Sequence, residues 1–298
     1  MQQRNANVGD EDLNSALGPL FGLFLRFNNQ PATYSLRESL EEVRAACVSG
    51  NINIHPQELD RMIDFCEDKG RDMVTLAGED KSVAEIAALA LYTTEFYAQS
   101  SVYGELNRLL RSKNRQELKP FVRYIWLLMW GLRKAPAFPG RMIYRGVKLN
   151  LSREYQDRCD RTVIWHQFSS CTCNVAVQNS DQFMGSQGER TLFSIELTTN
   201  RGRQVQEYSL LPDEQEVLLP PNSVFSVRGV FNAGNGLTMV QLLEEPPRDP
   251  ILDFPVPPPP IPAPAPAPAP VCTLLTLLPF YSPNFENTLL YDFFFLPR

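Results

Sequence analysis

Apolar residues in the first half of the chain recur at the spacing of α-helices. Leu36, Leu40 and Val43 fall near one face of a helix that starts after residue 35. The same spacing predicts further helices over residues 56–66, 83–103 and 117–132. In the last of these Trp126 and Trp130 stand four positions apart, and we interpret this aromatic stripe as core because apolar stripes at helical spacing usually face inward.

Beyond residue 136 the apolar pattern shortens toward the alternation of β-strands. Six strands are predicted, over residues 143–149, 163–172, 192–197, 216–219, 224–230 and 237–243. Because the helices come first and the strands follow, the order of elements favours an α+β domain over alternating βαβ units.

Composition divides the chain of 298 residues into one domain with flanking segments. With 43% hydrophobic and 21% charged residues, the chain can bury one good-sized core and carry an appendage. Residues 1–34 are expected to be poorly ordered, and residues 35–245 to form the domain. Proline then predominates, so residues 246–270 are expected to form an extended linker of the polyproline II type. Residues 271–298 form an apolar C-terminal tail of unknown role.

Two interpretations stay open for each of the last two segments. The linker is most simply a spacer; the alternative is that residues 255–270 bind a polyproline-binding partner of the SH3 or WW type. The tail, which Pro279 and Pro283 interrupt, is either a partner-binding peptide that folds back on the domain or the product of a wrongly assigned coding end.

Charge and composition exclude several classes of function. Lys and Arg number 28 against 34 Asp and Glu, a formal net charge of −6, so nucleic-acid binding is not expected. No apolar run has the length of a membrane span and the first residues lack an apolar signal region, so an intracellular, cytoplasmic protein with reduced thiols is expected.

Cofactor motifs are limited as well. The six cysteines and two histidines lack the spacing of a zinc site, so no metal is expected. Neither a G-x-G-x-x-G turn after a strand nor a Walker-type lysine loop is found, which excludes a doubly wound dinucleotide fold.

Three short segments carry residues suited to chemistry on a nucleotide. Glu214 and Glu216 begin a strand-like run, and residues two apart in a strand share a face, so their carboxylates are expected to converge. Arg145 offers a planar fork that suits bidentate contact with phosphate. Ser170 and Thr172 carry hydroxyls at strand spacing, able to orient a ribose. Each segment alone is more often a solvated edge, a strand-end cation or an ordinary turn.

The order and spacing of the three segments resemble those of the arginine-specific mono-ADP-ribosyltransferases. The chain reads Tyr-Arg-Gly at 144–146, Phe-x-Ser-x-Thr at 168–172 and Tyr-Ser-x-x-Pro-x-Glu-x-Glu at 208–216. This is the pattern of the family's arginine-serine-Glu-x-Glu branch, and the likeness covers residues 85–245. One difference is Cys171, which stands between two hydroxyls where the family commonly has Ser-Thr-Ser.

The resemblance implies a fold and a role for each motif residue. The fold would be a helical N-terminal part followed by two small packed sheets, with NAD in a central cleft. Arg145 would hold the pyrophosphate of NAD, and Ser170 would position the ribose next to nicotinamide. Glu216 would bond the ribose 2′-hydroxyl and offset the charge that develops as nicotinamide leaves. Glu214 would orient and help deprotonate the incoming guanidinium. The residues expected near bound NAD on the same grounds are Gly146, Tyr92, Asn107, Ser209 and Phe183.

Two of these assignments carry alternatives. Phe183 is expected either to stack on nicotinamide or to fill a core position. Cys171 is a small substitute that should pack similarly, and it is a candidate site of oxidation.

The expected function is transfer of ADP-ribose from NAD, as substrate and without a metal, to arginine side chains of a protein acceptor. One alternative is an NAD glycohydrolase, in which water replaces the acceptor in the same cleft. The other is an inactive module that binds NAD or a protein. The presence of Arg145, Ser170, Glu214 and Glu216 together argues against the inactive module.

Overall fold

The structure is a computed structural model that describes residues 20–77, 81–94, 101–176, 184–209, 215–248 and 250–255. Two predicted site residues, Phe183 and Glu214, lie outside the described residues, as do the proline-rich segment from residue 256 and the C-terminal tail. The chain divides into two compact units, Met1–Pro257 and Pro258–Arg298.

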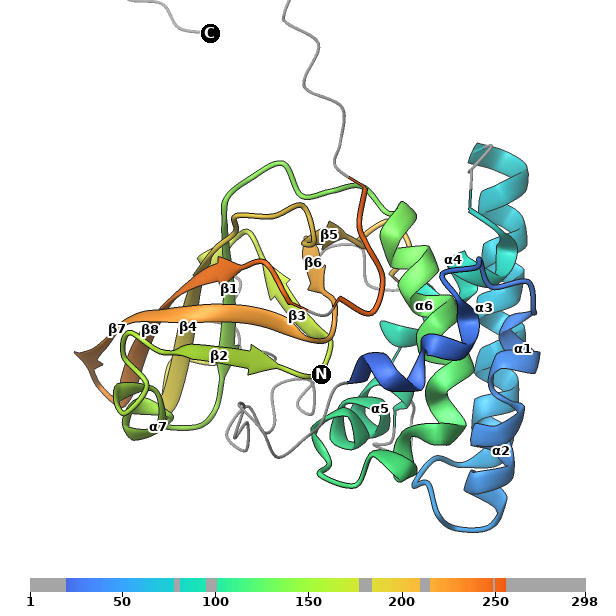
Figure 1. Cartoon of the computed structure of the whole chain (residues 1–298), viewed down its shortest axis with the longest axis horizontal. Coiled ribbons are helices and arrows are strands. Elements are labelled where there is room, and N and C mark those ends of the chain that lie inside the picture. Colours follow the sequence, from blue (N-terminus) through green and yellow to red (C-terminus); the bar gives the residue numbers. More distant parts are fainter. Residues whose placement is uncertain are drawn as a thin grey trace, which may run out of the picture. The chain divides into compact units, whose positions relative to one another are not determined.

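Helices gather on one side of the first unit and strands on the other (Figure 1). The helical layer opens with two 3₁₀-helices, η1 (Leu20–Leu23) and η2 (Leu25–Phe27). The first α-helix follows Ser35, whose side chain and Glu38 form a capping box. The α-helices of the layer are α1 (Leu36–Ser39), α2 (Glu41–Val48), α3 (Pro56–Ala77), α4 (Val83–Tyr92), α5 (Val102–Arg111) and α6 (Val122–Lys134), with the 3₁₀-helix η3 (Arg115–Phe121) ahead of α6. A small helix, α7 (Ser152–Gln156), lies among the strands.

The prediction of one continuous helix over residues 83–103 is wrong. The structure has α4, which ends at Tyr92, and α5, which starts at Val102. The hydroxyls of Thr93 and Thr94 donate to the carbonyl oxygen of Ala90, at 2.8 and 2.7 Å, and so satisfy the last turn of α4. Hydroxyls that bond nearby carbonyls in this way compete with the helix ladder, which the apolar periodicity does not reveal.

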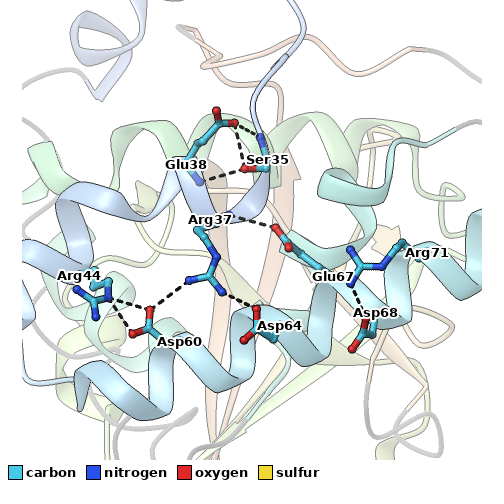
Figure 2. A network of polar contacts seen from close by, with 9 residues as sticks. All are labelled: Ser35, Arg37, Glu38, Arg44, Asp60, Asp64, Glu67, Asp68 and Arg71. Carbon is cyan, nitrogen blue, oxygen red and sulfur yellow. Dashed lines mark hydrogen bonds and ion pairs between the residues drawn. The ribbon is translucent and has the colours of Figure 1, made fainter.

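Charged side chains link the first two helices to α3 along an exposed face (Figure 2). Arg37 donates to the carboxylates of Asp60 and Asp64, and Arg44 donates to Asp60. These side chains are substantially exposed, and exposed ion pairs stabilise little. Apolar burial beneath them therefore contributes more to holding α1 and α2 against α3.

The described strands form one hydrogen-bonded sheet of eight, in the order β2-β7-β8-β4-β1-β3-β6-β5. Their bounds are β1 (Met142–Val147), β2 (Thr162–Trp165), β3 (Ser169–Thr172), β4 (Arg190–Glu196), β5 (Arg203–Gln204), β6 (Glu216–Leu219), β7 (Ser223–Gly234) and β8 (Leu237–Glu245). The predicted α+β class, helices first and strands after, is confirmed.

Two expectations about the strands need correction. The strand predicted over 163–172 is two strands, because the chain turns at His166–Phe168 and passes from β7, the partner of β2, to β1 and β6, the partners of β3. The resemblance implied two separate sheets, whereas the structure has one continuous sheet. Within it β1 and β3 are joined by one register pair only, Tyr144↔Thr172. The sheet therefore consists of a five-stranded and a three-stranded part with a narrow connection.

Buried apolar residues form two clusters, which lie on opposite faces of β6. The helical cluster is built mainly from α1 to α6 and includes Leu218 of β6. The sheet cluster is built from the strands and α7 and includes Val217 and Leu219. Alternate residues of β6 thus enter different cores, as strand geometry requires when both faces are covered. The predicted core role of Trp126 is confirmed, since it is buried in the helical cluster.

The packed domain reaches beyond both predicted boundaries. Apart from the apolar patch over residues 20–25, residues 1–34 were expected to be poorly ordered, but Phe24 of that patch is buried and Phe27 beyond it stacks on Trp126 with ring centroids 4.9 Å apart. After Glu245, Ile251 and Phe254 are also buried in the helical cluster. The change in composition near residue 245 therefore does not mark the end of packing, because the apolar residues before the prolines belong to the core.

Candidate active site

Arg145 lies in β1, buried between the two parts of the sheet. Its strand is rich in β-branched and aromatic residues and pairs along its full length with β4 on one side. On the other side pairing with β3 stops after Tyr144↔Thr172. The guanidinium Nη1 of Arg145 crosses this opening and donates to the carbonyl oxygen of Ser170 at 2.7 Å. The carbonyl oxygen of Ser170 in β3 thus accepts a hydrogen bond from the Arg145 side chain instead of from a backbone amide.

Gly146 and Ser170 face each other across the same opening. Antiparallel register counted from Tyr144↔Thr172 places Gly146 opposite Ser170. No β1–β3 register pair is found at these two residues in the described part of the chain. Glycine has no side chain there, so a ligand can approach the backbone closely.

Glu216 enters from the far side of β3. It is the first residue of β6, is 2% exposed, and pairs in register with Thr172, while Ser170 pairs with Leu218. Ser170 and Thr172 therefore share a face of β3, and the side chain of Glu216 lies on the same face.

The thiol of Cys171 lies within the influence of both Arg145 and Glu216. Burial raises the pKa of Cys171 to about 12; the Arg145 cation lowers this pKa and the Glu216 carboxylate raises it further. Both charges are therefore within electrostatic range of one sulfur atom. A buried thiol with a raised pKa holds little thiolate, which disfavours the oxidation expected at Cys171.

The strand alternation expected over residues 214–216 is interrupted at Gln215. β6 begins at Glu216, and Gln215 has φ 45°, in the left-handed region, so Gln215 is not part of the strand. Cys173 at the end of β3 donates its thiol to Oε1 of Gln215 at 3.5 Å. The role of Glu214, outside the described residues, stays a prediction.

Tyr92 and Asn107 meet at the helical side of β3. The amide of Asn107 donates to the hydroxyl of Tyr92 at 3.0 Å, and this hydroxyl is 3.5 Å from the carbonyl oxygen of Phe168. The rings of Tyr92 and Phe168 pack with centroids 5.3 Å apart. Oδ1 of Asn107 is buried and has no hydrogen-bond partner among the described residues. Buried polar atoms normally have a partner, so a polar ligand such as NAD fits this position.

Ser209 lies in a turn that follows β5. Its amide donates to the carbonyl oxygen of Val205 at 3.0 Å, and the amide of Val205 donates to the carbonyl oxygen of Glu216 at 3.1 Å. Lys69 and Lys81 reach this turn from the helical layer, and the sequence analysis missed both. Lys69 and Ser209 are 140 positions apart, and no local signal marks such a contact.

The described residues include no group of three or more His, Cys, Asp and Glu side chains that could hold a metal ion. In the same residues no helix has both the length and the apolar character needed to cross a membrane. All five cysteines in the described part of the chain are free thiols.

Comparison with known proteins places these features in one family. A family model described as NAD:arginine ADP-ribosyltransferase matches residues 61–246. The chain belongs to this family. The matched region contains β1, β3 and β6 and therefore every motif residue of the candidate site.

Two relatives show partial coverage. Human Ecto-ADP-ribosyltransferase 5 is 34% identical over 173 residues, which cover 54% of this chain and 54% of that protein. A Mycobacterium avium (strain 104) protein, named as the NAD(+)–arginine ADP-ribosyltransferase Mav, is 31% identical over 161 residues, 54% of this chain and 18% of that protein. The chain thus spans about half the length of the human relative and much less of the mycobacterial one.

A solved structure shows the same fold. ADP-ribosyltransferase HopU1 of Pseudomonas syringae pv. Tomato DC3000 superposes with a TM-score of 0.52 at 20% identity, covering 73% of this chain and 100% of that chain. The ADP-ribosyltransferase fold that the resemblance implied is therefore confirmed.

Proposed function

We propose that the chain transfers ADP-ribose from NAD to arginine side chains of a protein acceptor, with release of nicotinamide. The observation that carries the proposal is the meeting of Arg145, Ser170 and Glu216 where β1 and β3 part. Membership of the NAD:arginine ADP-ribosyltransferase family supports both the donor and the acceptor.

Binding of NAD would use the opening between β1 and β3. Arg145 supplies a cation whose planar fork suits the pyrophosphate. Gly146 supplies backbone groups for the nicotinamide amide, and the hydroxyl of Ser170 faces the adjoining ribose. Tyr92 and Asn107 border the same region from the helices, where Oδ1 of Asn107 is available as an acceptor.

Bond breaking would rely on Glu216. The ribose C1′–N bond breaks and its electron pair leaves with nicotinamide, so positive charge develops on the ribose. A buried carboxylate that bonds the 2′-hydroxyl stabilises this oxocarbenium-like state, as carboxylates do in glycoside hydrolysis. Removing one such stabilising group costs ~2.7–4 kcal/mol in the activation free energy, or roughly 100–1000-fold in rate.

Bond formation would rely on Glu214. A guanidinium nitrogen of the acceptor forms the new bond to C1′ and gives up one proton, which the Glu214 carboxylate accepts. A carboxylate also pairs with a guanidinium through charge-assisted hydrogen bonds, which favours arginine over neutral acceptors. If water takes the place of the guanidinium, the same site acts as an NAD glycohydrolase.

Two finer points are part of the proposal. The acceptor is a protein that presents an accessible arginine, and a polyproline-binding domain is a candidate partner for residues 255–270. An intracellular location stays a prediction from the sequence, and the human relative is named as an ecto-enzyme.

The test is nicotinamide release from NAD by the purified chain, with and without excess agmatine, a small guanidino acceptor. Mass spectrometry should detect ADP-ribosyl-agmatine, and Glu216→Ala should abolish both products. Free ADP-ribose without an adduct would instead identify a glycohydrolase, and bound NAD without turnover would identify a binding module.

A second variant separates the roles of the two glutamates. Glu214→Gln removes the proton acceptor and leaves Glu216 in place, so adduct formation should collapse while nicotinamide release survives. Equal loss of both products would contradict this division of roles.

A further inference from the structure

The backbone of Glu216 is bonded to a turn formed by residues 205–209. β5 runs beside β6, and directly after β5 the amide of Val205 donates to the carbonyl oxygen of Glu216 at 3.1 Å. The carbonyl oxygen of Val205 in turn accepts from the amides of Tyr208 and Ser209, both at 3.0 Å. The position of this turn therefore affects the position of the residue that the proposed reaction depends on most.

Two cations of the helical layer hold the far end of this turn. Nζ of Lys69, on α3, donates to the carbonyl oxygen of Ser209 at 2.7 Å. Nζ of Lys81, just before α4, lies 4.8 Å from the centre of the Tyr208 ring, within cation–π range. Adjacent residues of the turn are thus contacted by separate lysines from separate helical segments.

Both contacts draw lysine away from solvent. Lys81 is only 6% exposed, and Lys69 is half-buried, with a pKa that burial lowers from its ordinary value. Desolvating an ammonium group is costly, whereas a lysine on a helix surface can usually keep its charge in water. Val205 and Tyr208 are buried in the helical cluster, so apolar packing keeps the turn against the helices but does not direct its hydrogen-bonding groups. Lys69 adds a directional hydrogen bond to Ser209, and Lys81 adds a cation–π contact with Tyr208.

We propose that Lys69 and Lys81 are positioning residues of the active site, which act on Glu216 through the turn formed by residues 205–209. The connection is a series of three hydrogen bonds, from Lys69 to Ser209, from Ser209 to Val205, and from Val205 to Glu216. The inference rests on the proposed function, because it assigns to the helical layer the placement of the carboxylate at the reacting ribose.

Loss of Lys69 should affect turnover more than NAD binding. Without its ammonium group the buried carbonyl of Ser209 loses its donor, and the turn can shift together with the backbone of Glu216. A misplacement of about 1 Å far from the chemistry can cost about 100-fold, so Lys69→Met should lower kcat for nicotinamide release by roughly 10- to 100-fold. Because Glu216 acts on the transition state, its displacement should lower kcat and kcat/KM together and leave KM for NAD unchanged.

The experiment compares three variants of the full chain by steady-state kinetics, thermal unfolding and amide hydrogen exchange. Lys69→Met removes the donor, and Lys69→Arg restores a cationic donor and should recover part of kcat. Lys134→Met is the matched control, since Lys134 is also half-buried and its ammonium group bonds Glu85 of α4 at 2.9 Å. It should lower Tm without a specific loss of kcat.

Two results would overturn the proposal. One is Lys69→Met with the kcat of the parent chain; the other is an equal loss of kcat in Lys134→Met at the same loss of Tm. Amide exchange gives a readout that does not need activity: the Val205 amide should exchange faster in Lys69→Met. If the parent chain releases no nicotinamide, the proposed function fails, and unchanged exchange at Val205 would then overturn the link itself.

Discussion

The two apolar clusters of the domain differ in how their residues are drawn from the chain. The sheet cluster takes its large side chains from strands of one part of the sheet, and Trp165 packs edge to face or tilted against Phe193 and Phe225 with centroids about 5 Å apart. The helical cluster joins segments from both ends of the described chain, from Phe24 to Phe254.

This difference shows what each cluster does for the site. The sheet cluster fixes the strand β1 that carries Arg145. The helical cluster covers the opposite face of β6 and brings in the lysines that hold the turn beside Glu216. Its outermost parts, Phe24 and Phe254, lie outside the region that matches the family, residues 61–246. Changes in the two clusters should therefore differ in their effects on the free energy of unfolding and on the rate of nicotinamide release.

Truncation of the chain gives the largest expected effect. A chain that ends after Glu245 loses Ile251, Leu252 and Phe254 from the helical cluster, each worth about 1.5–3 kcal/mol of burial. Its free energy of unfolding, measured with urea, should fall by the sum of these contributions. A chain that ends after residue 257 is the control and should match the full chain. Equal stability of the two truncated chains would show that the segment from 250 to 255 does not support the helical cluster.

A cavity in the sheet cluster should also lower the free energy of unfolding, but by a smaller amount than the truncation. Phe225→Ala removes a fully buried ring that contacts Trp165 and lies on β7, which does not pair with β1, and such changes cost about 3–5 kcal/mol. The protein that stays folded should keep its rate of nicotinamide release per molecule, because no group facing NAD is changed. A specific loss of rate in fully folded protein would mean that this cluster also tunes the site.

Acid should lower the free energy of unfolding through His166, which lies in the chain between Trp165 of the sheet cluster and Phe168 of the helical cluster. Burial lowers the pKa of His166 from 6.5 to about 4, with a smaller lowering by Arg115 and an opposing hydrogen bond to Asn222. The unfolded chain therefore takes up the proton first, and stability present above pH 6.5 is lost as the pH falls toward 4. A shift of this size corresponds to about 3 kcal/mol.

Two variants test the assignment to His166. Urea unfolding between pH 7 and pH 4 should show a shallower pH dependence in His166→Gln than in the parent chain. His55→Gln, which changes an exposed histidine, should keep the parent's dependence. If both variants titrate like the parent, carboxylates rather than His166 account for the loss in acid.

Residues in local motifs could be predicted from the sequence more readily than the contacts that surround them. The strand predicted over 216–219 matches β6 residue for residue. Arg145, Ser170 and Glu216 could be proposed as site residues because each stands in a local motif. Features that depend on contacts between distant segments were not predictable in this way. Examples are the ends of the domain at Phe24 and Phe254, and Lys69, whose partner is 140 positions away. The strand rule failed at Gln215 because its left-handed backbone conformation has no signature in the hydrophobic pattern.

Glu216→Gln tests the central claim most directly, with nicotinamide release and the free energy of unfolding measured on the same preparation. In the proposed reaction this buried carboxylate acts at the ribose. Nicotinamide release should therefore fall by roughly 100–1000-fold, while stability stays close to that of the parent chain because glutamine has nearly the same volume. A variant that keeps its rate, or that loses rate only in proportion to lost folded protein, would contradict the account.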